Sequence, residues 1–247
     1  MSAVLILDQV VKRFGGLHAV KGVSLQVEPG ERRVVIGPNG AGKTSLFHCI
    51  SGALQVTSGR IECLGQDITH MPEHQRTLLG IGRTFQISSV FADLTVLENI
   101  ALARLGIQPS KWSMWRSALD TPGLRELAAE QLERVGLPGR ESWSVKSMSY
   151  GERRQLELVL ALVNQPRLLL LDEPCAGLSP AERQRLSAII RALPRSITML
   201  MIEHDMDIAL GLADRVSVLH HGEVIVEGDS RDVQRDPLVR EVYFGQL

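Results

Sequence analysis

Residues Gly37 to Thr44 have the types and the spacing that can bind a phosphate group. They read GPNGAGKT, which fits the pattern GxxxxGK[ST] and lies between a strand-like run and a helix-like run. Glycines in such a loop let successive backbone N–H groups point at one anion, in front of the positive end of a helix dipole. In this pattern Lys43 reaches the β- and γ-phosphates of a nucleotide, and the Thr44 hydroxyl is placed to bind Mg²⁺. The alternative is a glycine-rich turn that opens an ordinary strand–helix unit. The candidate nucleotide-binding residues are Gly37, Pro38, Asn39, Gly40, Ala41, Gly42, Lys43, Thr44 and Ser45.

A pair of acids follows a continuous apolar run further along the chain. Leu168 to Leu171 are four consecutive leucines, as expected of a strand buried on both faces. Asp172 and Glu173 come next, at the carboxyl end of that strand. If the strand lies beside the one that leads to the phosphate loop, Asp172 faces a bound Mg²⁺ and Glu173 can point at an attacking water. The alternative is a solvated acid in a loop.

Composition excludes several classes of protein. With 247 residues, 44% of them hydrophobic, the chain can build a proper core in one large domain or in a domain with an insertion. The three cysteines have no CxxC spacing, so neither a disulfide framework nor a zinc site is expected, and a reducing cytoplasm fits best. A net charge of −1 argues against the broad basic face that nucleic-acid binding requires.

The sequence gives no sign of a membrane segment of its own. No stretch approaches the roughly 18–20 apolar residues of a membrane helix. The run from Met1 to Asp8 has no basic region and is not a signal peptide. Any role at a membrane is therefore expected to come through partners.

The elements that position these residues are predicted from periodicity and turn chemistry. Runs rich in β-branched residues, separated by Gly15-Gly16 and Glu28-Pro29-Gly30, predict an antiparallel layer that leads to the phosphate loop. Its expected strands are Val4–Val11, Val23–Val27 and Arg32–Ile36. The helical period is followed by six positions, of which only Gln131 is polar: Leu124, Leu127, Ala128, Gln131, Leu132 and Val135. Residues 88–165 are therefore predicted to be a helical subdomain, inserted between two parts of an α/β core at 1–87 and 166–247.

The α/β pattern resumes after residue 166. Ser179 can cap a helix, Pro180 suits its first position and Glu182 completes a capping box, so a helix is predicted to about Arg191. The other expected elements are a strand at Ile197–Ile202, a hairpin of Arg215–His220 and Glu223–Glu227, and short helices at Ser230–Arg235 and Pro237–Phe244.

Five further features occur in the order found in the ATP-binding cassette (ABC) ATPases, which the chain resembles over nearly its whole length. They are an aromatic Phe14, Arg83–Gln86 like a Q-loop, Met148–Glu152 like a signature motif, Ala176–Ser179 like a D-loop, and Ile202–Asp205 with a switch histidine. The resemblance implies the P-loop NTPase fold of an ABC ATPase. This is an α/β core of a mixed sheet with an antiparallel β layer, plus an inserted α-helical subdomain. It also implies that the chain binds ATP and Mg²⁺.

The resemblance further implies roles for single residues. Phe14 would stack on adenine, although its ring could equally pack against the sheet. Gln86 would touch Mg²⁺ or the attacking water, and His204 would contact the γ-phosphate. The candidate catalytic residues are then Glu173, His204, Gln86 and Asp172, and the candidate metal ligands are Thr44, Gln86 and Asp172.

The signature motif implies action in a dimer. In this family it binds the ATP of the other subunit, so Ser149 and Gly151 of one chain would complete the site of a second ABC ATPase in an ATP sandwich. Ser149 and Glu152 also form a capping box, which accounts for part of the motif as simple helix initiation. Tyr150 stands where the family pattern has a glycine, and Ser179 stands where the D-loop has an aspartate.

The combined motifs are similar to those of the ATPases of bacterial branched-chain amino-acid, amide and urea importers of the LivG type. That group shares the departures at Tyr150 and Ser179. The resemblance implies a peripheral subunit on the cytoplasmic face of the bacterial inner membrane. Its partners would be two transmembrane permease subunits and a second ATPase, either a homologous chain or a copy of itself. A periplasmic solute-binding protein would act with it indirectly, and no nucleic acid is expected. The alternatives are the ATPase of an exporter or lipid-transfer system, and a soluble ABC ATPase without a transport role.

Overall fold

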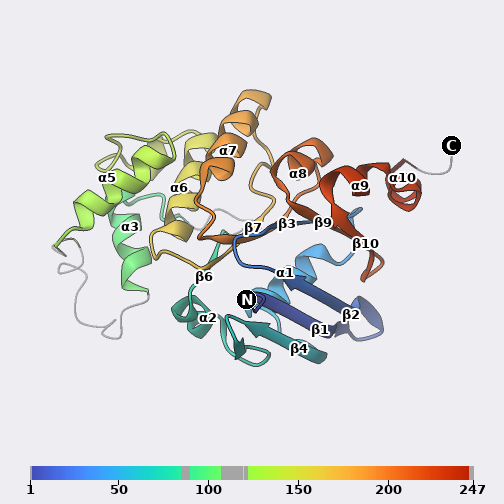
Figure 1. Cartoon of the computed structure of the whole chain (residues 1–247). Helices are drawn as coiled ribbons and strands as arrows, with labels where there is room; N and C mark the ends of the chain where they lie inside the picture. The colour runs from blue at the N-terminus through green and yellow to red at the C-terminus, as the bar shows by residue number, and fades with distance from the viewer. Residues whose placement is uncertain (1, 85–89, 107–118, 120–121, 245–247) are drawn as a thin grey trace. The chain divides into compact units, whose positions relative to one another are not determined.

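The computed structural model describes residues 2–84, 90–106, 119 and 122–244 (Figure 1). Contacts within the chain divide it into two compact units. Unit 1 consists of Met1–Ile81, Arg167–Glu173 and Pro194–Leu247, and unit 2 consists of Gly82–Pro166 and Pro174–Leu193.

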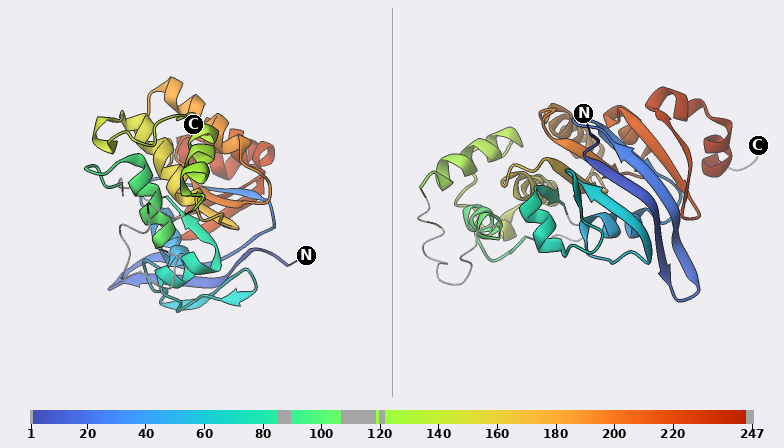
Figure 2. Two further views of the ribbon diagram at one scale, coloured as in Figure 1. Left: turned by 90° about the vertical axis from the view of Figure 1, so that its left-hand side faces the viewer. Right: turned by 60° about the horizontal axis from the view of Figure 1, so that its bottom comes forward.

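An antiparallel sheet forms one layer of unit 1. Its strand order is β2-β1-β4-β5, with β1 at Leu5–Phe14, β2 at Leu17–Val27, β4 at Ser58–Cys63 and β5 at Gln66–Asp67. Strands β1 and β2 run side by side to a shared tight turn (Figure 2), where Phe14 pairs with Leu17 across Gly15-Gly16. The hairpin extends beyond the expected strands. Its end was not predicted, because the apolar and polar residues there do not alternate and both Phe14 and Leu17 face solvent.

A mixed sheet forms the second layer and positions the candidate site. Its order is β10-β9-β3-β8-β7-β6, with β10 at Glu223–Asp229, β9 at Arg215–His220, β3 at Arg32–Ile36, β8 at Thr198–Ile202, β7 at Leu168–Asp172 and β6 at Ile81–Arg83. Strand β3 is parallel to β8 and β9, and β7 is parallel to β8. The carboxyl ends of β3, β8 and β7 therefore share one edge, where α/β sheets place their ligands.

Two details of the expected topology are wrong. Arg32–Ile36 was expected as a strand of the antiparallel layer, but it is β3 of the mixed sheet and runs parallel to β8 and β9. Asp172 was expected on the strand directly beside the strand of the phosphate loop, but β8 lies between β7 and β3. The reason is that β8, which follows β7 in the chain, inserts between the two strands and pairs with both. Asp172 is nevertheless at the shared carboxyl edge, opposite Ile202 of β8.

Helix α1 (Lys43–Ser51) lies between the two sheets of unit 1 (Figure 1). Its Leu46, Phe47 and Ile50 are at most 2% exposed and belong to a core cluster with side chains of both sheets. The start of α1, which carries the phosphate loop, is thus fixed by burial of this apolar side. The other helices of unit 1 are α2 (Glu73–Leu79), α8 (Met206–Leu212), α9 (Ser230–Arg235) and α10 (Pro237–Phe244).

Unit 2 is helical in the part that the structure describes. It contains α3 (Val96–Leu105), α5 (Leu124–Arg134), a 3₁₀ turn at Val145–Ser147, α6 (Tyr150–Leu162) and α7 (Pro180–Ala192). Helices α3, α5 and α6 contact one another pairwise, and Ile100, Leu132 and Leu156 are fully buried. The predicted helix over 124–135 is confirmed within one residue, and so is the capping box of Ser179 and Glu182 at the start of α7.

Candidate functional site

The phosphate loop joins the buried strand β3 to α1, as the sequence predicts. Gly42 precedes the first residue of α1 with a φ of 103°, and a Cβ built on it would overlap the backbone oxygen of Ala19. Only glycine fits this conformation and this close approach. Asn39 and Gly40 are exposed at the tip of the loop, where its backbone is open to a ligand.

Lys43 is folded back onto the loop that it belongs to. Its Nζ donates hydrogen bonds to the backbone oxygens of Gly37 at 2.7 Å and of Pro38 at 3.1 Å, and the residue is 7% exposed. Burial lowers the pKa of Lys43, against the opposing charges of Glu173 and then Asp172. The two acids are thus near enough to stabilise the ammonium group. A phosphate that replaced the two carbonyl oxygens would give this charge a stronger partner.

Asp172 and Glu173 differ in their surroundings. Asp172 is 1% exposed at the end of β7, whereas the Glu173 side chain is 24% exposed. Glu173 has a φ of 46°, and its N–H donates to the backbone oxygen of Ile202 at 3.0 Å. A left-handed conformation costs a non-glycine residue about 1–3 kcal/mol and is often retained where function needs it. No sequence pattern predicted this strained backbone.

His204 lies between two carboxylates at the end of β8. Its Nδ1 is 3.8 Å from Oε2 of Glu173 and 3.6 Å from Oε1 of Glu203. The ring is 54% exposed, whereas Glu203 is fully buried. The structure therefore brings Lys43, Asp172, Glu173 and His204 together in unit 1, with the histidine ring open to a ligand.

Glu203 is a residue that the sequence analysis missed as part of this site. It is 0% exposed, and burial raises its pKa to about 7, against the opposing effects of His204 and of backbone N–H groups of His204 and Asp205. The only sequence signal was an acid between the buried strand and His204. The protonation state of Glu203 decides how much negative charge lies 3.6 Å from Nδ1 of His204.

Replacing Glu203 by Gln should make stability less dependent on pH. The folded carboxyl group, with a pKa of about 7, holds a proton that an unfolded glutamate releases near pH 4.3. The unfolding free energy of the wild type therefore falls as the pH rises through this interval, by up to about 4 kcal/mol from this group. Urea unfolding at about pH 5.5 and about pH 8.5 measures this. The unfolding free energy should fall more between the two pH values in the wild type than in Glu203→Gln. Equal losses in both proteins would contradict the expectation.

Phe14 is 46% exposed at the end of the β1–β2 hairpin, with Lys12 Nζ 5.0 Å from the centroid of its ring. It therefore does not pack fully against the sheet, which was the alternative to stacking. The same hairpin reaches the phosphate loop, because Ala19 of β2 lies against Gly42. An exposed aromatic face on the hairpin that contacts the phosphate loop suits a nucleotide base.

Ser149 and Gly151 belong to unit 2, at the start of α6. The Ser149 side chain accepts from the N–H of Glu152 at 3.2 Å, and the Glu152 carboxylate accepts from the N–H of Ser149 at 2.8 Å, which completes a capping box. A Cβ on Gly151 would overlap the carboxylate of Glu182, so a side chain there would have to displace Glu182 from its capping position. Gln86, the remaining predicted site residue, lies outside the described residues.

Unit 1 contains side-chain oxygen atoms that could serve as ligands of Mg²⁺. Thr44, in the first turn of α1, supplies a hydroxyl and Asp172 supplies a buried carboxylate, and α1 contacts β7. Mg²⁺ usually takes one or two such protein ligands, with phosphate oxygens and waters completing its shell. Throughout the described ranges, no group of three or more His, Cys, Asp or Glu side chains could hold a metal ion.

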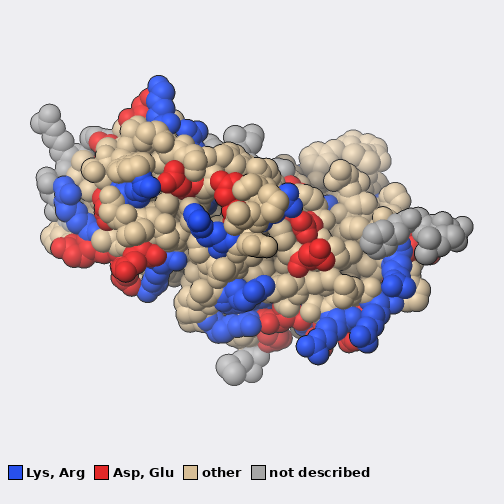
Figure 3. Space-filling view, turned by 90° about the horizontal axis from the view of Figure 1, so that it is seen from above, with Lys and Arg blue, Asp and Glu red and all other residues tan. Residues whose placement is uncertain are grey.

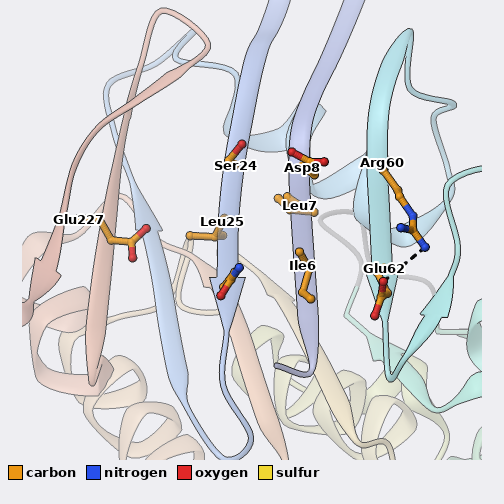
Figure 4. Close-up of a pocket in the computed structure, with 9 residues that line it drawn as sticks. Ile6, Leu7, Asp8, Ser24, Leu25, Arg60, Glu62 and Glu227 are labelled. Carbon is orange, nitrogen blue, oxygen red and sulfur yellow. Dashed lines mark ion pairs between the residues drawn. The ribbon is translucent and has the colours of Figure 1, made fainter. Parts of the chain in front are cut away.

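A groove on the antiparallel sheet is separate from this site. Glu227 of β10 faces it from one side and Arg60 and Glu62, paired at 3.4 Å, from the other (Figure 4). The lining residues are Ile6, Leu7, Asp8, Ser24, Leu25, Gln26, Arg60, Glu62 and Glu227. None belongs to the phosphate loop or to the acids around His204.

Two surface properties bear on partners. On the face seen in Figure 3, basic and acidic side chains are interspersed, so that face carries no broad basic region. Within the part of the chain that the structure describes, no helix has both the length and the apolar character needed to cross a membrane.

Comparisons with known proteins agree with this geometry. Residues 20–176 match the ABC transporter family. The chain is similar to the high-affinity branched-chain amino acid transport ATP-binding proteins LivG of Escherichia coli (strain K12) and BraF of Pseudomonas aeruginosa. Each is 36% identical over 252 residues, which cover 98% of this chain and 98% of the relative.

Solved structures extend the likeness to the fold. The ADP conformation of MJ1267, an ATP-binding cassette of an ABC transporter, matches with a TM-score of 0.85 and 30% identity, covering 100% of both chains. A nucleotide-free cassette from an ABC transporter matches with a TM-score of 0.84 and 30% identity, covering 99% of this chain and 100% of the other.

Proposed function

Because this chain belongs to the ABC transporter family of ATPases, we propose that it is the ATP-hydrolysing subunit of a bacterial importer for branched-chain amino acids or related small solutes such as amides and urea. The observation that supports this most directly is the convergence of Lys43, Glu173 and His204 at one sheet edge. The LivG and BraF proteins, similar over 98% of the chain, support the cargo class.

The phosphate loop would bind the triphosphate of ATP through its backbone N–H groups. Lys43 leaves the oxygens of Gly37 and Pro38 and pairs with the β- and γ-phosphates, and Phe14 stacks on the adenine. Thr44, Asp172 and Gln86 would hold Mg²⁺, which would neutralise charge on the phosphate oxygens.

Glu173 would act as the general base for the attacking water. Its carboxylate is partly exposed and lies 3.8 Å from Nδ1 of His204, so the histidine orients it from one side. His204 contacts the γ-phosphate with its exposed edge and so senses whether that phosphate is present. The buried Glu203 supports the ring from behind, 3.6 Å from the same nitrogen.

Two ATPase chains would form the working unit. Ser149 and Gly151 at the start of α6 form a helix N-terminus that receives the γ-phosphate bound by the partner chain. The partner is a copy of this chain or a homologous ABC ATPase. We assign the catalytic core to residues 1–87 and 166–247 and the signature subdomain to residues 88–165.

A role in transport requires further protein partners besides the second ATPase. Two transmembrane permease subunits would receive this chain at the cytoplasmic face of the inner membrane, as a peripheral subunit. A periplasmic solute-binding protein would deliver the cargo and contact the permease. The charges are interspersed on the face seen in Figure 3, and no nucleic-acid partner is part of this proposal.

Deleting the gene should abolish high-affinity uptake of one solute among leucine, isoleucine, valine, urea and short amides. The reason is that the permease cannot alternate without ATP hydrolysis, while the cargo itself meets only the receptor and the permease. Uptake of each radiolabelled solute in the deletion strain measures this, with the wild-type gene and a Glu173→Gln gene supplied in trans as matched controls. Unchanged uptake of all of them, together with loss of export or lipid transfer, would overturn the importer assignment and leave the ATPase assignment intact.

A further inference from the structure

The hydroxyl group of Tyr150 has three hydrogen bonds within unit 2. It donates to the backbone oxygen of Ala176 at 3.1 Å, and it accepts from Nε of Arg154 at 3.0 Å and from Nη2 of Arg154 at 2.8 Å. A phenolic hydroxyl has one proton to donate, and here that proton is directed at the segment that precedes α7. Tyr150 thereby links the first residue of α6 to a segment 26 positions further along the chain.

The guanidinium group that orients this hydroxyl is itself fixed. Nη1 of Arg154 pairs with Oε2 of Glu157 at 2.9 Å, and the two side chains are only 9% and 4% exposed. A buried, paired guanidinium has little freedom to move, so it holds the Tyr150 oxygen in place. The Tyr150 residue, in contrast, is 47% exposed, so core packing does not account for it.

A second contact joins the same two segments. Ser179 and Glu182 form the capping box of α7, and the Glu182 carboxylate lies against the space where Gly151 has no Cβ. Gly177 has a φ of 75°, and a Cβ on it would be 3.2 Å from the Tyr150 ring. The start of α6 and the loop Ala176–Ser179 are therefore held together on both sides of Tyr150.

We propose that Tyr150 is a positioning residue that holds the start of α6 and the loop Ala176–Ser179 as one rigid surface for the partner chain. This inference rests on the proposed function, because it requires that Ser149 and Gly151 act on ATP bound by a second chain. It predicts a specific pattern. Loss of the hydroxyl weakens the contribution of this chain to its partner's site and leaves its own phosphate loop unaffected.

Pairs formed from two different inactive variants show which chain's contribution to ATP turnover is lowered by Tyr150→Phe. Lys43→Ala chains keep their signature and Ser149→Arg chains keep their phosphate loop, so a mixed pair has one working composite site. Tyr150→Phe on the Lys43→Ala chain, which supplies the signature, should lower turnover about tenfold, as expected for loss of a charged hydrogen bond. The same substitution on the Ser149→Arg chain should have a much smaller effect. Equal losses in the two placements would overturn the proposal.

Arg154 supplies a matched variant for the same link. Arg154→Met combined with Glu157→Gln, so that no carboxylate is left buried without its partner, should reproduce the loss on the signature-supplying chain. Adding Tyr150→Phe to these two should change little, because the same connection is already lost. Additive losses would mean that the two side chains act independently and would contradict the link.

Hydrogen–deuterium exchange tests the link in a single chain, whether or not chains pair. In Tyr150→Phe, amides between Ala176 and Glu182 should exchange about tenfold faster, since local opening has lost one anchoring bond. Amides of the phosphate loop serve as the internal control and should not change. Unchanged exchange at 176–182 would overturn the proposal. If mixtures of Lys43→Ala and Ser149→Arg alone were inactive, that result would argue against pairing of two copies of this chain, and the exchange experiment would still test the link.

Discussion

Replacing Glu173 by Gln should lower ATP turnover by ~10²–10⁴-fold while leaving ATP binding nearly intact, since that is the typical contribution of a positioned general base. Gln has the same shape, so the strained backbone at a φ of 46° and the contact with Ile202 are expected to persist. The amide cannot accept the proton of the attacking water. The substitution therefore isolates the proton-transfer step from folding and binding.

Lys43→Ala provides the opposite pattern as a control. This substitution removes the cation that pairs with the phosphates, so ATP binding itself should weaken. Nucleotide titration and single-turnover hydrolysis on both variants separate the two effects. Wild-type turnover of Glu173→Gln would contradict the proposed role of Glu173 as general base. It would not affect the assignment of the phosphate loop.

The sequence predicted the buried elements well because their signals are local. Four consecutive leucines at 168–171, followed by two acids, predicted a strand buried on both faces, and all four are fully buried in β7. The Ser179-Pro180 start of α7 follows from capping chemistry alone. In contrast, β4 at Ser58–Cys63 was missed, although Ile61 and Cys63 alternate with polar neighbours, because only two apolar residues carry the pattern.

The candidate site was predictable in its members but not in its geometry. The motifs pointed to Lys43, Asp172, Glu173 and His204 as candidates, and the structure places the four together. The insertion of β8 between β3 and β7, in contrast, depends on pairings that no local pattern encodes. The burial of Glu203 and the hydroxyl bond from Tyr150 to Ala176 likewise arise from segments that meet only in the folded chain.

Mixing two inactive variants should restore ATP hydrolysis if the signature acts in trans. A Lys43→Ala chain cannot hold the phosphates, and a Ser149→Arg chain places a bulky cation where Ser149 caps α6. Their mixed pair contains one site with an intact loop and an intact signature. With equal amounts and random pairing, half of the pairs are mixed and each has one working site, so about a quarter of wild-type turnover should return.

The matched control is a mixture of Lys43→Ala with the double variant Lys43→Ala/Ser149→Arg, which offers no working site in any pairing and so measures background. No recovery above this background at any ratio, with both chains folded, would contradict action in trans within a pair of copies. Size-exclusion chromatography of Glu173→Gln with ATP gives an independent readout, because slow hydrolysis should trap the ATP-bound pair. A strictly monomeric peak there would mean that pairing requires the permease or a different ATPase, and the composite site would then be expected only in the assembled transporter.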